Sequence, residues 1–247
     1  MKAAILGATK GIGRAIARLL IERGHTVFIL GRDAADLERS ARDLEVRSPK
    51  AIAPVRHAVC DLEEPDGWEG ALAAADDALG GCDTVIVTAA LFGTQDVLEA
   101  NTEFARRLLT VNVANTIAFC ELARKGLLAR GGGTLCVVSS VAGERGRKPV
   151  VIYGAGKAAL SAYLEGLDHK YRSAGLRTVC IKPGFVKTSM TDGLKPPPFA
   201  AEPERVAEDV LRAIDRGSPV VYTPSIWGLI MLVIRWLPRA VMRRIAF

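Results

Sequence analysis

Short, continuous apolar runs recur along the chain, and longer segments with helical periodicity separate them. Four of these runs are Val27–Leu30, Val85–Val87, Leu135–Val138 and Val179–Ile181. Apolar and polar residues do not alternate within the runs, which is typical of strands buried on both faces of a parallel sheet. Repeated strand-helix units of this length predict an α/β fold, a single Rossmann-type doubly wound parallel sheet flanked by helices, with ligands at the carboxyl ends of the strands.

Two more strands are expected, at Lys2–Leu6 and Val55–Cys60. No repeat, low-complexity tract or linker divides the chain, and the Pro196–Pro198 run predicts a loop over the site. We therefore expect one catalytic domain at residues 1–225, with 226–247 as an apolar, basic, helical extension of the same domain. The expected helices are Gly11–Arg23, Ala35–Leu44, Trp68–Leu79, Thr102–Ala129, Val150–Ala174 and Pro203–Arg216.

Composition excludes several classes of protein. The 247 residues are 49% hydrophobic and 24% charged, which excludes disordered and fibrous chains. The net charge is +6, but four arginines and no acid lie from residue 226 onward, which leaves +2 on the rest. Positive and negative charges nearly balance over residues 1–225, which does not indicate a nucleic-acid partner. The five cysteines show no metal-ligand spacing, so we expect buried free thiols and no metal site. Free thiols and the lack of a recognisable signal peptide predict a cytoplasmic protein.

A glycine-rich segment follows the first expected strand and opens a helix. Glycines permit the tight turn and let backbone N–H groups approach a pyrophosphate at the positive end of the helix. The placement of the segment between a strand and a helix therefore predicts a dinucleotide site. The candidate cofactor contacts in it are Gly7, Thr9, Lys10, Gly11, Ile12 and Gly13.

The end of the second strand indicates which cofactor is preferred. An acidic side chain there would hold the ribose hydroxyls of NAD, but the position is Gly31, and Arg32 follows it. Arg32 can accept a 2′-phosphate and Lys10 adds a second cation, so NADP(H) is favoured over NAD(H). Solvated charges remain the alternative, and Asp33 beside Arg32 keeps NAD(H) open. Asp61, after the third strand, is placed to accept from the adenine amino group.

Tyr153 and Lys157 lie four residues apart near the start of a helix, so phenol and ammonium share one helical face. A neighbouring cation favours phenolate, which predicts a tyrosine pKa lowered from about 10 toward the working pH. Such a group can protonate a carbonyl oxygen as hydride arrives. Ser140, at the end of the strand Leu135–Ser139, can hydrogen-bond the same oxygen.

The motifs follow one another in the order Gly7-x3-Gly11-x-Gly13, Asn112, Ser140, Tyr153 and Lys157. Over essentially the whole chain this order resembles the short-chain dehydrogenase/reductase family. The resemblance implies that Tyr153 is the acid/base, that Lys157 lowers its pKa and binds the nicotinamide ribose, and that Ser140 orients the carbonyl. It also implies that Asn112 holds a water in a proton relay, and that the chain forms a homodimer or homotetramer through its two longest helices.

The segment after the sixth strand carries the resemblance further, because Pro183-Gly184 and Thr188 match the part that holds the nicotinamide, with Val186 lending its backbone to the carboxamide. The chain departs from the family where Leu6 replaces a frequent Thr, and where Thr88-Ala89-Ala90-Leu91 replaces Asn-Asn-Ala-Gly. The second change removes amides that usually brace the sheet centre. The remaining expected cofactor contacts are Leu62 and Ala89.

Two features bear on the substrate. Arg145, Arg147 and Lys148 lie between the candidate serine and tyrosine, where they are either solvated or recognise an anionic substrate. Ile226–Leu237 is strongly apolar but too short to span a membrane. Arg235, Arg239 and Arg243 recur every four residues, so their side chains share one face if the helix continues through Pro238. This extension predicts an interfacial amphipathic helix, or a cover for the cleft or a subunit interface.

The later motifs are Ser139-Ser140-x-Ala-Gly-Glu-Arg145, Tyr153-Gly, the Pro-Gly loop, Tyr222-x-Pro and Arg235-x-Leu237-Pro238-Arg239. Together they resemble one branch of the family, the reductase component of decaprenylphosphoryl-ribose 2′-epimerase, which reduces a 2-keto sugar carried on a polyprenyl phosphate. We therefore predict an NADP(H)-dependent reductase of a hydrophobic ketone, with a phosphorylated keto-sugar lipid as one form of that substrate. Peripheral contact with the inner face of a membrane through residues 226–247 is part of this hypothesis. The alternatives are a general ketone or 3-oxoacyl reductase, and a non-catalytic NADP(H)-binding regulator.

Overall fold

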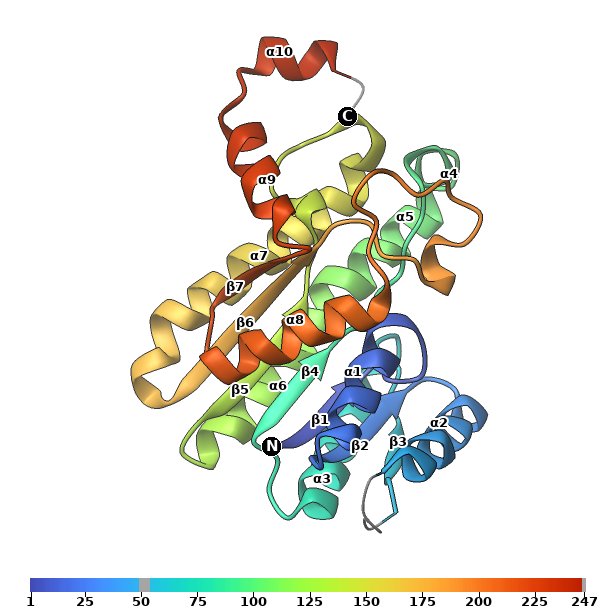
Figure 1. Cartoon of the computed structure of the whole chain (residues 1–247), viewed down its shortest axis with the longest axis vertical. Coiled ribbons are helices and arrows are strands. Elements are labelled where there is room, and N and C mark those ends of the chain that lie inside the picture. The colour runs from blue at the N-terminus through green and yellow to red at the C-terminus, as the bar shows by residue number, and fades with distance from the viewer. Residues whose placement is uncertain (49–53, 246–247) are drawn as a thin grey trace.

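A computed structural model describes residues 1–48 and 54–245 and contains one seven-stranded parallel sheet (Figure 1). The strand order is β3-β2-β1-β4-β5-β6-β7. The order reverses between β1 and β4, and such a switch point is where open α/β sheets bind their ligands. The predicted fold class is confirmed. The strands are β1 Lys2–Leu6, β2 Thr26–Gly31, β3 His57–Val59, β4 Thr84–Val87, β5 Gly133–Val138, β6 Leu176–Pro183 and β7 Val220–Thr223.

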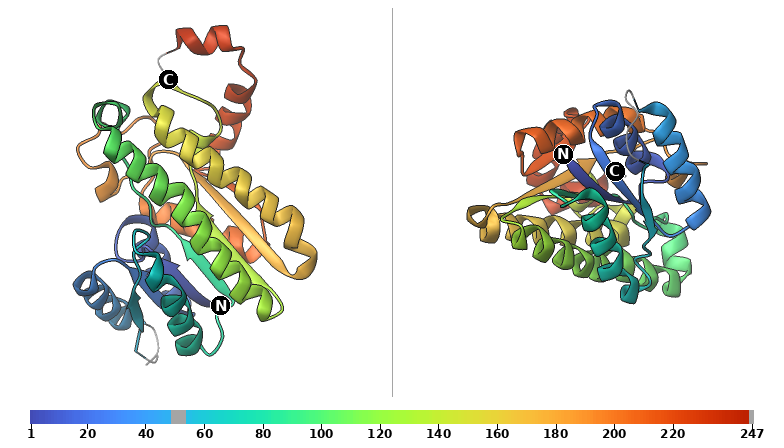
Figure 2. Two further views of the ribbon diagram at one scale, coloured as in Figure 1. Left: turned by 180° about the vertical axis from the view of Figure 1, so that it is seen from behind. Right: turned by 90° about the horizontal axis from the view of Figure 1, so that it is seen from below.

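Helices cover both faces of the sheet (Figure 2). The side chains of β1 explain why, since Ala3 and Ile5 belong to one buried apolar cluster while Ala4 and Leu6 belong to another on the opposite face. A strand apolar on both faces needs a helical layer on each. One layer contains α1 Gly11–Glu22, α2 Ala34–Arg47 and α8 Pro203–Arg216, and the other contains α3 Trp68–Leu79, α6 Thr116–Ala129 and α7 Val151–Tyr171.

Three local expectations need correction. β7 was not among the predicted strands, and the expected strand Val55–Cys60 is paired only over β3. The expected single helix Thr102–Ala129 is divided into α5 Thr102–Leu109, a π-helical turn at Thr110–Asn115, and α6. The short helix α4 Gln95–Ala100 precedes α5. π-helical turns within α-helices are frequent at functional sites, and this one contains Asn112, a predicted catalytic residue.

The C-terminal extension forms two helices, α9 Ile226–Trp236 and α10 Arg239–Arg244, at one end of the molecule (Figure 1). Leu237 has extended backbone (φ −62°, ψ 133°), as expected for a residue that precedes proline. The helix therefore does not continue through Pro238, and the continuous arginine face that would follow from such a helix does not form. None of the helices in the described ranges has the length and apolar character needed to cross a membrane.

Candidate active site

The phosphate loop between β1 and α1 leaves no room for side chains at two of its glycines. A Cβ on Gly13 would lie 2.2 Å from the Gly7 carbonyl oxygen, and one on Gly7, whose φ is +90°, would lie 2.7 Å from the Ala89 amide nitrogen. The first turn of α1 has neither a side-chain cap nor an acidic residue. Its backbone N–H groups and the positive end of the helix dipole therefore suit an anion, which fits the pyrophosphate of a dinucleotide.

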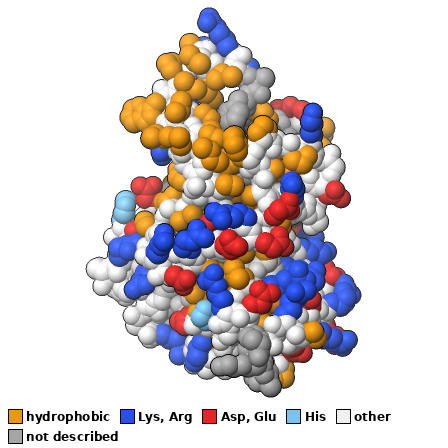
Figure 3. All heavy atoms as spheres, viewed as in Figure 1, with side chains coloured by type: hydrophobic (Ala, Val, Ile, Leu, Met, Phe, Trp, Pro, Cys, Tyr) orange, Lys and Arg blue, Asp and Glu red, His pale blue; other side chains and the backbone are white. Residues whose placement is uncertain are grey.

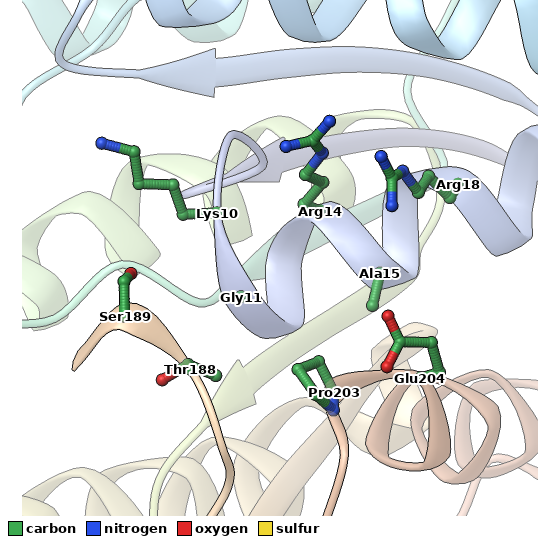
Figure 4. Close-up of a pocket in the computed structure, with 9 residues that line it drawn as sticks. All are labelled: Lys10, Gly11, Arg14, Ala15, Arg18, Thr188, Ser189, Pro203 and Glu204. Carbon is green, nitrogen blue, oxygen red and sulfur yellow. The ribbon is translucent and has the colours of Figure 1, made fainter. Parts of the chain in front are cut away.

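The loop after β6 folds onto this phosphate loop. The Thr188 methyl carbon lies 3.1 Å from the position that a Cβ on Gly11 would occupy. Beside this contact is a hollow of about 310 Å³, whose lining includes Lys10 just before α1 and Thr188 and Ser189 of the loop after β6 (Figure 4). The candidate catalytic tyrosine is not among the residues that line it. The hollow therefore belongs to the phosphate end of the site.

The residues around the end of β2 have separate partners. Asp33 caps α2, because its Oδ1 accepts a hydrogen bond of 2.7 Å from the Asp36 amide, and Lys10 pairs with Asp36 at 3.0 Å. The Asp33 carboxylate thus has a structural partner, while the Arg32 side chain is exposed. A Cβ on Gly31 would lie 3.5 Å from the Thr9 methyl group, in ordinary contact. Because Asp33 caps α2 and Arg32 is exposed, this environment suits Arg32 as a phosphate ligand better than it suits Asp33 as a ribose ligand.

Asp61 and Leu62 follow β3 at the same edge of the sheet. The Asp61 carboxylate accepts from the Glu63 amide at 3.0 Å, and its main-chain oxygen accepts from the Trp68 indole at 2.6 Å. The Leu62 main-chain oxygen accepts from the Asn115 side chain at 2.7 Å. These bonds fix the turn after β3, and contact with adenine stays a prediction.

Ser140, Tyr153 and Lys157 come together at the carboxyl ends of β5 and β6. The Ser140 hydroxyl accepts from the Ala142 amide at 3.0 Å and donates to the Pro183 carbonyl at 3.4 Å. The Ser140 hydroxyl is also near enough to the Tyr153 phenol to affect its pKa. The Lys157 ammonium lies 5.7 Å from the Tyr153 ring centroid and donates to the Val138 carbonyl at 2.8 Å. The predicted phenol, hydroxyl and ammonium are therefore neighbours.

The predicted lowering of the Tyr153 pKa is wrong for this arrangement. Burial raises the pKa of Tyr153, and the neighbouring Ser140 hydroxyl opposes that rise without cancelling it. Burial also lowers the pKa of Lys157 to about 8, because the ammonium loses hydration in the interior. Tyr153 is consequently held as the neutral phenol at neutral pH, the form that can donate a proton.

Asn112 lies in the π-helical turn, and both ends of its side-chain amide contact Leu91. Its Oδ1 accepts from the Leu91 amide and its Nδ2 donates to the Leu91 carbonyl, each at 2.7 Å. Thr88 donates from its hydroxyl to the Leu6 carbonyl at 3.0 Å. The sheet centre thus has two braces although the family's usual amides are absent from residues 88–91. A proton relay through Asn112 stays a prediction.

A buried ionic cluster lies beside the catalytic residues, and sequence reasoning missed it. Glu144, whose side chain is 5% exposed, pairs with Lys182 at 2.5 Å and with Arg235 at 3.3 Å. The Tyr222 hydroxyl donates to the same carboxylate at 3.0 Å. The four residues come from the loop after Ser140, from β6, β7 and α9, and no local pattern connects segments so far apart in sequence.

Two of the three loop cations contact the C-terminal extension. Arg145 donates to the Leu237 carbonyl at 2.9 Å and Lys148 donates to the Arg243 carbonyl at 2.7 Å. Leu237 is the C-cap of α9 and Arg243 lies in the last turn of α10, and cations are favourable partners at such helix ends. Arg145 and Lys148 therefore have partners within the chain, and recognition of an anionic substrate by the three cations stays a prediction.

Gly184, a predicted nicotinamide contact, lies against the indole of Trp227. A Cβ at this position would lie 2.0 Å from Trp227 Nε1, so Gly184→Ala requires α9 to shift. We expect this variant to lose roughly 1–3 kcal/mol of unfolding free energy. Gly126→Ala is the matched control, because Gly126 lies within α6 with no atom within 4 Å of its added Cβ. That control should gain roughly 0.5–1 kcal/mol, and equal values for both variants in urea unfolding would contradict the packing described.

Comparison with known proteins agrees with this geometry. Residues 1–198 match the short chain dehydrogenase family. An uncharacterized oxidoreductase of Myxococcus xanthus is 33% identical over 92% of this chain and 88% of its own length. Carbonyl reductase family member 4 of Xenopus tropicalis is 28% identical over 93% of this chain and 94% of its own length. An actinorhodin polyketide ketoreductase solved with NADPH has the same fold, with a TM-score of 0.78 and 22% identity over 90% of this chain and 95% of that one. The chain is thus a member of the short-chain dehydrogenase family, an oxidoreductase that acts on CH–OH and C=O groups.

Proposed function

We propose that this protein reduces a hydrophobic ketone to a secondary alcohol with NADP(H). The observation that carries the proposal is the convergence of Ser140, Tyr153 and Lys157 beside a glycine loop that fits a pyrophosphate. The relative named as a carbonyl reductase supports carbonyl reduction, and the ketoreductase neighbour was solved with NADPH. A regulator without chemistry would have no use for a buried acid, hydroxyl and ammonium in this arrangement.

In the proposed reaction, one set of residues holds the cofactor and another acts on the carbonyl oxygen of the substrate. When bound, NADP(H) supplies the hydride that reaches the carbonyl carbon. The phosphate loop would hold the pyrophosphate, and Pro183-Gly184, Val186 and Thr188 would hold the nicotinamide. Ser140 orients the carbonyl oxygen, and the Tyr153 hydroxyl donates its proton to that oxygen. The Lys157 ammonium then stabilises the negative charge left on the phenolate oxygen.

The apolar surroundings of Ser140 support a hydrophobic substrate. Val141, the next residue, belongs to a buried cluster with Trp227, Met231 and Ile234 of α9. A ketone at Ser140 would therefore approach an apolar wall built by the extension. A keto-sugar lipid, as in the epimerase branch, remains within this substrate class, and a 3-oxoacyl thioester is the competing choice. Buried free cysteines suit a reducing cytoplasm, where we place the enzyme, as a homodimer or homotetramer through α5, α6 and α7.

Titration with the two nucleotides tests the cofactor proposal. Arg32→Ala should weaken NADPH binding about tenfold and leave NADH binding unchanged, because only NADPH presents a 2′-phosphate to the guanidinium. Arg56→Ala, which removes another exposed arginine, is the control and should change neither affinity. Nicotinamide fluorescence measures both dissociation constants. Equal loss for both nucleotides would contradict the role of Arg32, and binding of neither by the wild type would overturn the proposed reductase.

A further inference from the structure

The outer face of α9 is apolar and exposed. The helix places Trp227, Met231 and Ile234 in the interior, where each is at most 9% exposed. The opposite face follows the same helical spacing and is solvent-accessible. Its members are Leu229 at 61%, Leu232 at 49%, Val233 at 58% and Trp236 at 82% exposed. A helix that is apolar on both faces is typical of a segment whose outer face has a further apolar partner.

These side chains gather at one end of the molecule. Figure 3 shows hydrophobic side chains concentrated over α9 and α10, whereas charged side chains dominate the rest of that view. Val241 of α10, which is 42% exposed, and Ile245, which is 36% exposed, add to the same end. The surface is therefore a contiguous apolar patch rather than a set of scattered residues. We define the docking face as Leu229, Leu232, Val233, Trp236 and Val241.

Arginines border the docking face without acidic neighbours. Residues 226–247 contain no Asp or Glu. Arg235 pairs with Glu144, but the arginines of α10 have no ion pair within the described ranges of the chain. These arginines are Arg239, Arg243 and Arg244, all exposed. An apolar face edged by positive charge is complementary to an anionic lipid surface.

Charge also argues against a second copy of the chain as the partner. A symmetric dimer through the docking face would bring the arginines of two α10 helices together, because a two-fold interface joins one patch to itself. The extension supplies no Asp or Glu side chain to neutralise them. An anionic bilayer instead offers phosphate groups to the arginines and acyl chains to the apolar side chains. α9 is eleven residues long, about 16 Å at the α-helical rise, so it would lie in the interface rather than span the hydrocarbon.

We propose that α9 and α10 dock this enzyme on an anionic phospholipid surface. Two hydrogen bonds hold the extension against the loop that follows Ser140. Arg145 donates to the Leu237 carbonyl, and Lys148 donates to the Arg243 carbonyl. The inner face of α9 contacts Val141 beside Ser140. Docking would therefore bring the substrate side of the site near the lipid, where hydrophobic ketones concentrate. The proposal goes beyond ketone reduction and does not depend on it.

Vesicle binding by the full-length protein tests the proposal. We expect binding to vesicles of phosphatidylcholine mixed with phosphatidylglycerol, and at least tenfold weaker binding to phosphatidylcholine alone. High salt should weaken the binding, because it screens the arginines. Arg239→Glu with Arg243→Glu should lower vesicle affinity more than tenfold, since each charge near the surface is worth about fivefold. Trp236→Ser should also lower it about tenfold, because Trp236 is the most exposed member of the docking face.

Matched controls lie at the opposite end of the molecule. Val46→Ser removes an exposed apolar side chain of α2 and Arg56→Glu reverses an exposed arginine, and neither should change vesicle binding. All four variants should keep wild-type turnover of a water-soluble ketone. Binding that is absent, equal with both lipids, or equally reduced by the controls would overturn the proposal. It would also be overturned if Trp236→Ser reduced the oligomer size in gel filtration while the wild type ignored vesicles, since a second copy would then cover the face.

Discussion

Replacing Tyr153 with Phe is expected to lower kcat for ketone reduction about a thousandfold while NADPH affinity stays within about twofold of the wild-type value. The ring remains to fill its site against Phe92, whose centroid lies 5.2 Å away. What is lost is the hydroxyl next to Ser140, which is the proposed proton donor. Single-turnover reduction by bound NADPH, followed by the decay of its absorbance, separates this loss from any change in product release.

Tyr163→Phe is the matched control for that variant. Tyr163 lies in the same helix, and its hydroxyl donates to Glu121 at 2.8 Å, away from the catalytic residues. This variant should lose about 1 kcal/mol of unfolding free energy and retain its turnover. If Tyr153→Phe turned over like Tyr163→Phe, another group would be the acid. Loss of NADPH binding in Tyr153→Phe would instead show that the phenol supports the nucleotide site.

The features predicted correctly from the sequence are those that neighbouring residues specify. The turn at Gly7 and the start of α1 depend on residues within one strand-helix unit, and the lack of space for Cβ atoms there agrees with the glycine spacing. Tyr153 and Lys157 share a face because they are one helical turn apart. Continuous apolar runs identify strands of a sheet covered on both faces. Local patterns of this kind therefore predicted the central sheet and the proximity of Ser140, Tyr153 and Lys157, whose catalytic roles stay a prediction.

The features that were missed depend on contacts between distant segments. Four segments contribute to the Glu144 cluster. Its Tyr222 lies on β7, an edge strand of only four residues with a proline on each side. Likewise, Arg145 has a helix end as its partner, 92 residues further along the chain. The pKa of Tyr153 was predicted from its neighbour in the helix, but burial by the whole fold sets its direction. Desolvation is a tertiary property, so sequence spacing does not reveal it.

The pKa of Lys157, about 8, predicts that ketone reduction slows as pH rises through that value. Below pH 8 the side chain is an ammonium and stabilises the developing phenolate of Tyr153, whereas above it that charge is lost. Tyr153 itself stays protonated throughout, because burial raises its pKa. Well above the pKa, kcat/KM should fall about tenfold per pH unit, and the total fall between pH 8 and 10 should be about fiftyfold. Initial rates with saturating NADPH from pH 6 to pH 10 measure this profile.

Lys157 also makes stability depend on pH, but stability rises over the pH range in which activity falls. Its folded pKa lies below the ordinary value of 10.5, so between about pH 8 and 10.5 the unfolded chain binds more protons than the folded one. The free energy of unfolding of the wild type should therefore increase over this window relative to that of Lys157→Met, which has no proton to lose. Lys157→Arg, charged at every pH tested, should not show the fall in activity near pH 8. An unchanged fall in Lys157→Arg would assign the titration to another group, whereas a stability difference constant with pH would show that Lys157 keeps its ordinary pKa.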